Sequence, residues 1–172
     1  MTNKDCILCE KSDYRVLYKA SGGMRDVDPG VYRCTSTGHG SFGQIVKCNS
    51  CGLVYINPRR DDAEILKDYS EVVDDKYLNE KKYRLLTFNR SLELIKKYKK
   101  SGKILDIGCY IGTFLEAARQ DGWDTYGVEP SRWAAAYARK ELGLNVLEGA
   151  VEECSKFGTD FDVVTLWDSI EH

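Results

Sequence analysis

The sequence lacks three features that would set it apart from ordinary globular proteins. It has no run of about 18 apolar residues, so no membrane-spanning helix is expected. Residues 1–6 lack the apolar core of a signal peptide, which predicts a cytoplasmic protein. The formal net charge is only −2, so no overall field attracts the chain to nucleic acid or to anionic lipid. Apolar residues make up 42% of the chain, which is enough for a hydrophobic core.

Three stretches of different composition divide the chain into a small domain, a linker and an α/β domain. Residues 1–60 are rich in Gly, Ser, Thr, Tyr and Cys, and their short β-prone runs predict a ribbon of strands. Residues 61–101 space apolar side chains three and four apart, which predicts helices, the first capped by Asp61. Residues 102–172 alternate strands with helices, the pattern of parallel strands joined by right-handed crossovers.

The apolar pattern also predicts the individual elements. The β-prone runs of the ribbon are 31–34, 44–47 and 53–56. In the rest of the chain, strands are expected at 103–107, 125–129, 144–147 and 161–167, and helices at 79–100, 113–121 and 131–142. The expected fold class is therefore α/β, with about four parallel strands preceded by a small ribbon and a helical linker.

Four of the seven cysteines form two Cys-x-x-Cys pairs, Cys6 with Cys9 and Cys48 with Cys51. Two such pairs supply four thiolates that reach one Zn²⁺ at ~2.3 Å in a tetrahedral shell. Four sulfurs leave no open position on the metal, so the zinc is expected to be structural. The alternative is a redox dithiol in one pair, which the two-pair arrangement disfavours. The other cysteines are expected to be small buried apolar side chains: Cys34, Cys109 and Cys154.

A glycine-containing turn, Gly108–Gly112, follows the strand expected at 103–107 and precedes a helix. Backbone N–H groups of such a turn and of the helix N-terminus face a ligand at the carboxyl end of the strand. The next strand ends in Glu129, and an acidic residue at that position accepts hydrogen bonds from both ribose hydroxyls of a nucleotide. The two features together predict a nucleotide-type binding site.

At these residues the sequence resembles the class I S-adenosylmethionine-dependent methyltransferases. Residues 105–112 match their first motif, 127–131 their second, and 161–172 resemble their fourth strand and the loop after it. Residues 48–60 resemble the zinc-binding N-terminal extension of one branch, whose members often modify sugars or other small molecules. The resemblance implies a Rossmann-like methyltransferase sheet, of which residues 102–172 form the N-terminal half.

The resemblance assigns roles in binding S-adenosylmethionine (SAM). Asp106 and Gly108 would shape the pocket for the methionine part, Glu129 would hold the ribose, and 148–151 would lie by the adenine. Trp167 would lie close to the cofactor, or alternatively would pack in the core. The full set of expected cofactor-binding residues is Asp106, Gly108, Cys109, Tyr110, Gly112, Glu129, Pro130, Ala150, Val151 and Trp167.

Two positions depart from the family pattern. Tyr110 stands where the family has the middle glycine of the first motif, so the turn is expected to keep a conformation that a bulky residue tolerates. Ala150 stands where many members place an Asp against the adenine amino group. Either change would weaken cofactor binding without abolishing it.

The sequence ends just after the fourth strand, whereas the family's sheet normally has seven. An open apolar edge at 161–167 is a feature that proteins usually avoid. The expectation is therefore a truncated chain, a fragment, or a chain that completes its sheet by self-association. The remaining catalytic candidates are Glu171 and His172, which with Asp168 resemble a metal-binding loop of some RNA- and quinone-modifying methyltransferases.

The predicted function is SAM-dependent methyl transfer to a small-molecule acceptor such as a nucleotide-linked sugar, with catalysis incomplete in this chain. The first alternative is an RNA-base methyltransferase with a zinc ribbon. The pI of about 5.8 and the absence of a basic stripe argue against it. The second alternative is a non-catalytic module in which the ribbon and the half-sheet serve assembly. The residues do not reveal the acceptor or the methylated atom.

Overall fold

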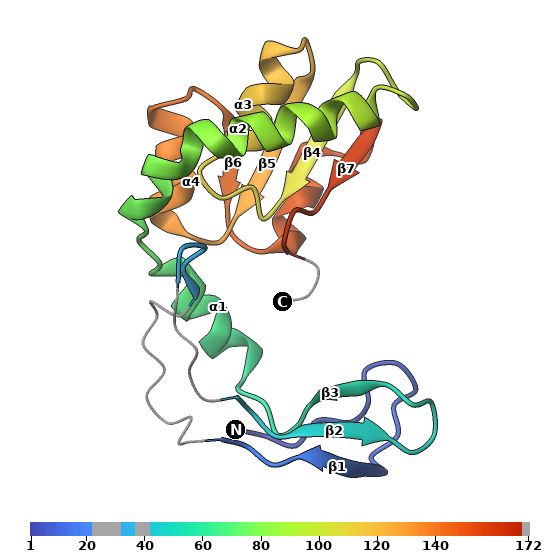
Figure 1. Cartoon of the computed structure of the whole chain (residues 1–172). Helices are drawn as coiled ribbons and strands as arrows, with labels where there is room; N and C mark the ends of the chain where they lie inside the picture. The colour runs from blue at the N-terminus through green and yellow to red at the C-terminus, as the bar shows by residue number, and fades with distance from the viewer. Residues whose placement is uncertain (22–31, 37–41, 170–172) are drawn as a thin grey trace.

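The computed structural model describes residues 1–21, 32–36 and 42–169 (Figure 1). The chain forms two separate sheets, a small antiparallel one near the N-terminus and a parallel one in the C-terminal half. Two helices connect them along the chain. None of the helices in these described ranges is long and apolar enough to cross a membrane.

The N-terminal sheet has three antiparallel strands in the order β1 (Tyr14–Tyr18), β2 (Ile45–Cys48) and β3 (Val54–Ile56). The runs at 44–47 and 53–56 are confirmed as strands to within one residue. The run at 31–34 was wrong as a strand, because its described residues 32–34 form turns. β2 is the central strand and pairs with β3 and with β1, and no sequence signal had singled out β1.

Two helices follow the small sheet. Helix α1 spans Asp62–Ser70, and Asp61 caps it by accepting a hydrogen bond from the Ala63 N–H at 2.9 Å, as expected. Helix α2 spans Asp75–Ile95, so it begins four residues before the predicted start. The prediction followed the apolar spacing that begins at Leu85. Tyr77, however, is also buried and extends the apolar face toward the N-terminus.

The C-terminal sheet consists of four parallel strands in the order β6-β5-β4-β7. The bounds are β4 (Lys103–Ile107), β5 (Asp124–Glu129), β6 (Asn145–Glu148) and β7 (Val163–Thr165). All four lie where strands were predicted, and β7 is shorter than its predicted run. The connections are α3 (Thr113–Gln120), α4 (Arg132–Lys140) and the 3₁₀ helix η2 (Val151–Phe157). The predicted α/β class with a partial Rossmann-like sheet is confirmed.

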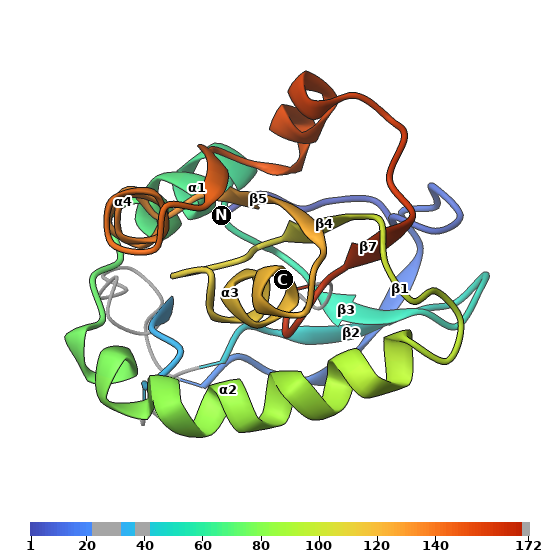
Figure 2. The same ribbon diagram turned by 90° about the horizontal axis from the view of Figure 1, so that it is seen from above.

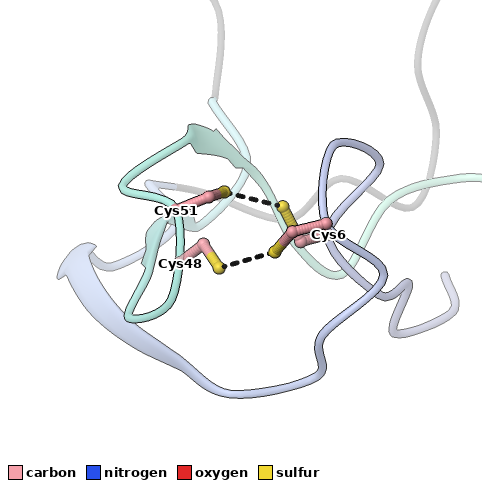
Figure 3. A group of neighbouring side chains, drawn as sticks. Cys6, Cys48 and Cys51 are labelled. Carbon is pink, nitrogen blue, oxygen red and sulfur yellow. Dashed lines mark hydrogen bonds between the residues drawn. The ribbon is translucent and has the colours of Figure 1, made fainter.

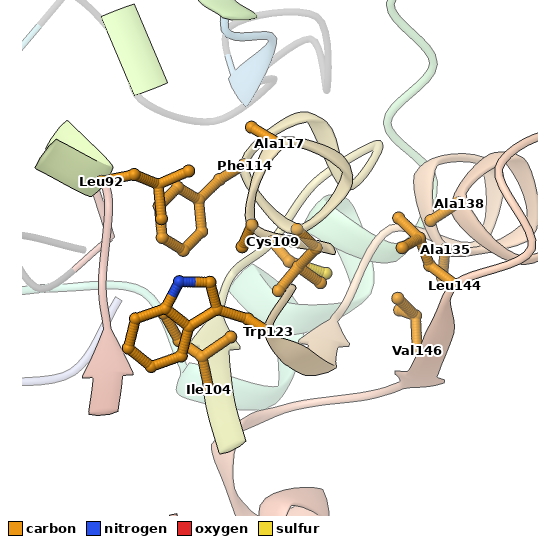
Figure 4. Close-up of a cluster of buried hydrophobic side chains, with 12 residues drawn as sticks. Leu92, Ile104, Cys109, Phe114, Ala117, Trp123, Ala135, Ala138, Leu144 and Val146 are labelled. Atoms are coloured by element: carbon orange, nitrogen blue, oxygen red, sulfur yellow. The ribbon is translucent and has the colours of Figure 1, made fainter. Parts of the chain in front are cut away.

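The main core lies between the parallel sheet and the helices α2 and α3, which run along the same side of it (Figure 2). At its centre Phe114 of α3 packs with Leu92 of α2 and with Trp123 at the entry to β5 (Figure 4). The other buried members are Ile104, Cys109, Leu115, Ala117, Ala118, Ala135, Ala138, Leu144 and Val146. Helix α2, placed by sequence in a linker, thus packs directly on the α/β part of the chain.

The register of the parallel strands decides where a ligand site forms. Asp106 pairs with Gly127, and Ile107 with Val128, so β4 and β5 end side by side at the same edge of the sheet. The turn that leaves β4 therefore lies next to Glu129, the last residue of β5. In open α/β sheets, ligands bind outside the carboxyl ends of the strands.

Candidate cofactor and metal sites

The turn between β4 and α3 has three residues with positive φ angles. They are Gly108 at 73°, Tyr110 at 49° and Gly112 at 78°. The turn was expected to keep a conformation that a bulky residue tolerates. Tyr110 has its φ near the small left-handed region, which L-residues can adopt but which glycine adopts at no steric cost. Such a conformation costs on the order of 1 kcal/mol in a non-glycine residue and persists where the surroundings impose it.

Close packing explains why Gly108 and Gly112 carry no side chain. A Cβ atom added at Gly108 would lie 2.5 Å from the Ser169 Oγ, and one at Gly112 would lie 2.5 Å from the Leu144 Cδ1. The segment after β7 therefore crosses directly over the β4 turn. Cys109 points the other way, into the main core, so only its backbone belongs to the turn.

Glu129 ties the turn to the start of α4. Its Oε2 accepts a hydrogen bond from the Tyr110 N–H at 2.7 Å, and its Oε1 accepts one from the Ser131 N–H, also at 2.7 Å. The residue is only 5% exposed, and burial raises the pKa of its carboxyl to about 7. Each carboxylate oxygen keeps a second lone pair, so Glu129 can still accept hydrogen bonds from a ligand.

Asp106 is the second buried acid at this edge. Its Oδ1 accepts a hydrogen bond from the Thr165 Oγ1 at 2.8 Å, which links the ends of β4 and β7. Burial raises the pKa of Asp106 to about 8, and the charge of Glu129 adds to this effect. Two acids in one buried region make a site that favours a cationic ligand, because a nearby positive charge stabilises both carboxylates.

Aromatic side chains cover the turn. The ring of Tyr110 lies 4.6 Å from that of Tyr77 and 6.0 Å from that of Trp133, measured between centroids. The guanidinium of Arg84 stacks 4.0 Å from the centre of the Tyr77 ring. The Tyr110 hydroxyl is buried and has no hydrogen-bond partner among the described residues. Sequence reasoning missed Tyr77, Arg84 and Trp133. Only Trp133 lies beside a motif along the chain, since Tyr77 and Arg84 belong to α2.

The other expected cofactor residues lie around the same edge. Pro130 directly follows Glu129, and Ala150 precedes η2, whose first residue Val151 is exposed. The Gly149 N–H donates to the Glu129 carbonyl oxygen at 3.0 Å, which brings this loop beside β5. Their roles in binding a cofactor stay predictions. The catalytic candidates Glu171 and His172 lie outside the described residues.

Of the two roles that the sequence left open for Trp167, core packing is confirmed, and a place beside the cofactor stays a prediction. It packs against the core, with ring centroids 5.1 Å from Phe114 and 5.7 Å from Phe88. It also lines a cavity of about 240 Å³ beside the carboxyl end of β7. Helix α2 and the segment after β7 form the walls, with Arg84, Thr87, Phe88, Ser91, Trp167 and Asp168.

The four predicted zinc ligands converge beside the N-terminal sheet. Figure 3 labels three of them, Cys6, Cys48 and Cys51. The Sγ atoms of Cys6, Cys9, Cys48 and Cys51 all lie within 4.8 Å of one another. The distances Cys6–Cys51 and Cys9–Cys48 are both 3.5 Å between sulfurs. A tetrahedron of sulfurs around zinc at ~2.3 Å has edges of about 3.8 Å, so the cluster fits this ion.

The two pairs share one local geometry. The Glu10 N–H donates to the Cys6 carbonyl oxygen at 2.8 Å, and the Gly52 N–H donates to that of Cys48 at 3.1 Å. Both closing residues have positive φ, 58° for Glu10 and 80° for Gly52. A backbone hydrogen bond from Cys51 is the main cause that lowers the pKa of Cys48 to about 6. A thiolate stabilised in this way is ready to bind a metal. Outside the cluster, Cys109 is buried as expected, Cys154 is half-buried, and Cys34 is exposed, contrary to expectation.

Comparison with known proteins gives the family. The family model described as a methyltransferase domain matches residues 73–172, more than half of the chain. This chain belongs to that methyltransferase domain family. The resemblance to class I SAM-dependent methyltransferases is therefore confirmed, and the match begins at the junction between α1 and α2.

The methyltransferase chain is also similar to individual proteins. The ubiquinone biosynthesis O-methyltransferase of mitochondria from Schizosaccharomyces pombe is 39% identical over 77 residues, which are 41% of this chain and 28% of that protein. DesVI from Streptomyces venezuelae is 23% identical with a TM-score of 0.46, over 63% of this chain and 44% of that one. The magnesium protoporphyrin IX methyltransferase from Synechocystis PCC 6803, solved with bound SAM, is 18% identical with a TM-score of 0.48, over 65% of this chain and 64% of that one. The chain thus spans less than two thirds of each of these proteins.

Proposed function

We propose that this chain binds SAM at the carboxyl edge of β4 and β5 and carries the cofactor-binding part of a SAM-dependent methyltransferase. The main support is the position of Glu129, whose carboxylate lies at the end of β5 and is bonded to the backbone of the β4 turn. A nucleoside whose ribose hydroxyls bond to Glu129 would lie against this turn and the N-terminus of α3.

The charge of the site also suits this cofactor. SAM supplies a methyl group on a positively charged sulfonium, which a nucleophilic acceptor atom can take. Asp106 and Glu129 are both buried acids with raised pKa values, so a bound cation would relieve an unfavourable environment. The turn that begins at Gly108 would border the methionine part, and the loop at 149–151 lies near enough to β5 to border the adenine.

We further propose a small-molecule acceptor, bound in the cavity beside Trp167. The cavity offers two aromatic rings, Phe88 and Trp167, and two hydroxyls, Thr87 and Ser91. Such walls suit one hydroxylated ring, because apolar faces stack on aromatic side chains while hydroxyl groups form hydrogen bonds. A nucleotide-linked sugar remains the first candidate. The similarity to a ubiquinone biosynthesis O-methyltransferase favours a hydroxyl oxygen on an aromatic ring as the second.

The four-cysteine cluster is proposed to hold one structural Zn²⁺. All four ligand positions are filled by sulfur, so the metal has no open site for chemistry. The ion would instead hold together a sheet of three short strands.

Calorimetric titration of the zinc-loaded chain with SAM tests the cofactor proposal. Glu129→Gln removes one acceptor oxygen and is expected to weaken binding at least tenfold, because hydrogen bonds to a charged group are lost. The matched control is Glu141→Gln, an exposed carboxylate at the C-terminal end of α4. Equal affinity of the two variants would contradict the proposed role of Glu129, and no binding by the folded wild type would contradict the proposed function.

A further inference from the structure

A short segment of the N-terminal part, Tyr32–Ser36, contacts the methyltransferase part directly. By sequence it lies between β1 and β2, yet it is found beside the junction of α1 and α2, away from the three-stranded sheet (Figure 1). The Arg33 Nε donates to the Val73 carbonyl oxygen at 2.8 Å. Tyr32 stacks on Tyr69 of α1 with ring centroids 4.5 Å apart. The segment therefore docks by specific contacts.

The central contact joins Thr35 to Asp74, the residue that precedes α2. The Thr35 N–H donates to Asp74 Oδ2 at 3.1 Å, and the Thr35 Oγ1 donates to Oδ1 at 2.5 Å. Asp74 is buried, and its side chain makes no capping bond to its own helix. Among the described residues, Thr35 supplies both side-chain hydrogen bonds to this carboxylate, so undocking of the segment would take two hydrogen bonds from a buried polar group.

Val72, two residues before Asp74 in the chain, is hydrogen-bonded to the start of α4 beside the proposed cofactor site. The carbonyl oxygen of Val72 accepts from the Ser131 Oγ at 2.9 Å. The backbone N–H of the same Ser131 donates to Glu129. The residues Val72–Asp74 are therefore held by the Tyr32–Ser36 segment on one side and by the start of α4 on the other.

The ends of the connection that carries this segment are fixed in the N-terminal part. The Ser21 N–H donates to the Phe42 carbonyl oxygen at 3.1 Å, and the Phe42 N–H donates to the Ser21 Oγ at 3.2 Å. Ser21 follows β1 and Phe42 precedes β2, the two strands that bring the cysteine pairs together. Loss of the metal would release these strands and raise the entropic cost of docking the segment.

We propose that Thr35 and Asp74 are positioning residues of the cofactor site, through which Zn²⁺ binding by the four cysteines strengthens the binding of SAM. This inference rests on the proposed function. The binding of Zn²⁺ beside one sheet and the binding of SAM at the other would then be coupled, and coupling of this kind is reciprocal. SAM binding is therefore expected to strengthen zinc binding by the same factor.

The test is a thermodynamic cycle on the whole chain. SAM affinity is measured by calorimetry with and without Zn²⁺, in the wild type and in Thr35→Val, which keeps the side-chain shape but removes the hydroxyl donor. Removal of zinc is expected to weaken SAM binding about tenfold in the wild type. Thr35→Val is expected to weaken it several-fold with zinc present, and zinc removal is then expected to have little further effect. The control Ser70→Ala, whose hydroxyl donates to the Lys67 carbonyl oxygen within α1, should behave as the wild type.

A second readout follows the structure itself. Hydrogen exchange at the amides of Val72–Asp74 is expected to accelerate in zinc-loaded Thr35→Val and in the zinc-free wild type. Equal SAM affinity of the wild type with and without zinc would overturn the inference and leave the proposed function intact. Additive effects of zinc removal and Thr35→Val would also overturn it, because zinc would then act by another route. Failure of every form to bind SAM would overturn the proposed function as well.

Discussion

The two sheets of this chain are stabilised by different means. The parallel sheet is covered by helices and shares a core of twelve buried residues that includes Phe114 and Trp123. The N-terminal sheet buries Val46 and the cysteines Cys6 and Cys48, while apolar residues such as Val54 and Ile56 stay exposed. The parallel sheet thus holds its shape by apolar burial, whereas the N-terminal sheet is proposed to depend on a metal held by its four cysteines.

The two sheets therefore differ in the sequence pattern that predicts them. An apolar repeat locates the strands and helices of a core. A set of ligand residues predicts that a small fold is held by a metal, but does not predict how its strands pair. Each prediction below distinguishes an effect on the N-terminal sheet from an effect on the parallel sheet.

Removal of the metal is expected to have the largest effect. Structural zinc contributes about 10 kcal/mol to the folding of small domains, so Cys48→Ser is expected to unfold the N-terminal sheet. Hydrogen exchange would detect this as lost protection in β1, β2 and β3 with protection retained in β4 and β5. Loss of protection in both sheets at once would contradict the view that the parallel sheet has a core of its own.

The corresponding change in the α/β part is the removal of one large side chain from its core. Phe114→Ala is expected to lower the free energy of unfolding of the α/β part by about 3–5 kcal/mol, because it removes a large buried side chain and leaves a cavity. All three tryptophans lie in this half, so their fluorescence during urea unfolding reports it selectively. The control Leu94→Ala, at an exposed position of α2, should change little. Zinc affinity in Phe114→Ala should stay close to that of the wild type.

The pH dependence of stability is expected to come from the buried acids of the parallel sheet. Burial raises the pKa of Asp106 from 3.8 to about 8 and that of Glu129 from 4.5 to about 7. Between these limits the native state binds more protons than the unfolded state, so the free energy of unfolding falls as pH rises through this window. Asp106→Asn should flatten this dependence between pH values of about 5.5 and 8, as followed by tryptophan fluorescence. An unchanged slope would exclude Asp106 as its source.

The strands of the parallel sheet were predictable because each is a short apolar run between turn signals. The site was predictable to the extent that it rests on a strand, a glycine turn and an acid. The sequence did not predict β1, whose residues Tyr14–Tyr18 are mostly exposed and so carry little apolar signal. It also missed the positive φ of Tyr110, since a non-glycine residue is rarely found there. The contact of Thr35 with Asp74 depends on docking between distant segments, which no local pattern encodes.

The smallest effect is expected from two buried tyrosine hydroxyls, one in each half. Tyr55 of β3 and Tyr110 of the β4 turn both have a buried hydroxyl without a hydrogen-bond partner among the described residues. Replacement by Phe removes an unsatisfied group, so Tyr110→Phe is expected to raise the free energy of unfolding of the α/β part by up to about 1 kcal/mol. Tyr55→Phe should leave tryptophan-detected unfolding unchanged and slow the release of zinc to a chelator. A loss of stability in Tyr110→Phe would indicate that this hydroxyl is bonded in solution.

The central claim is that the cofactor binds at the carboxyl edge of β4 and β5, and an NMR titration of the ¹⁵N-labelled, zinc-loaded chain with S-adenosylhomocysteine tests it most directly. The account predicts saturable shifts of the amide signals at 108–112, at Glu129 and Ser131, and at 149–151, with the largest changes in the β4 turn. The distant strands β1 and β3 should show little change. Saturable shifts confined to the N-terminal sheet, or none at a cofactor concentration well above the micromolar range, would contradict the claim.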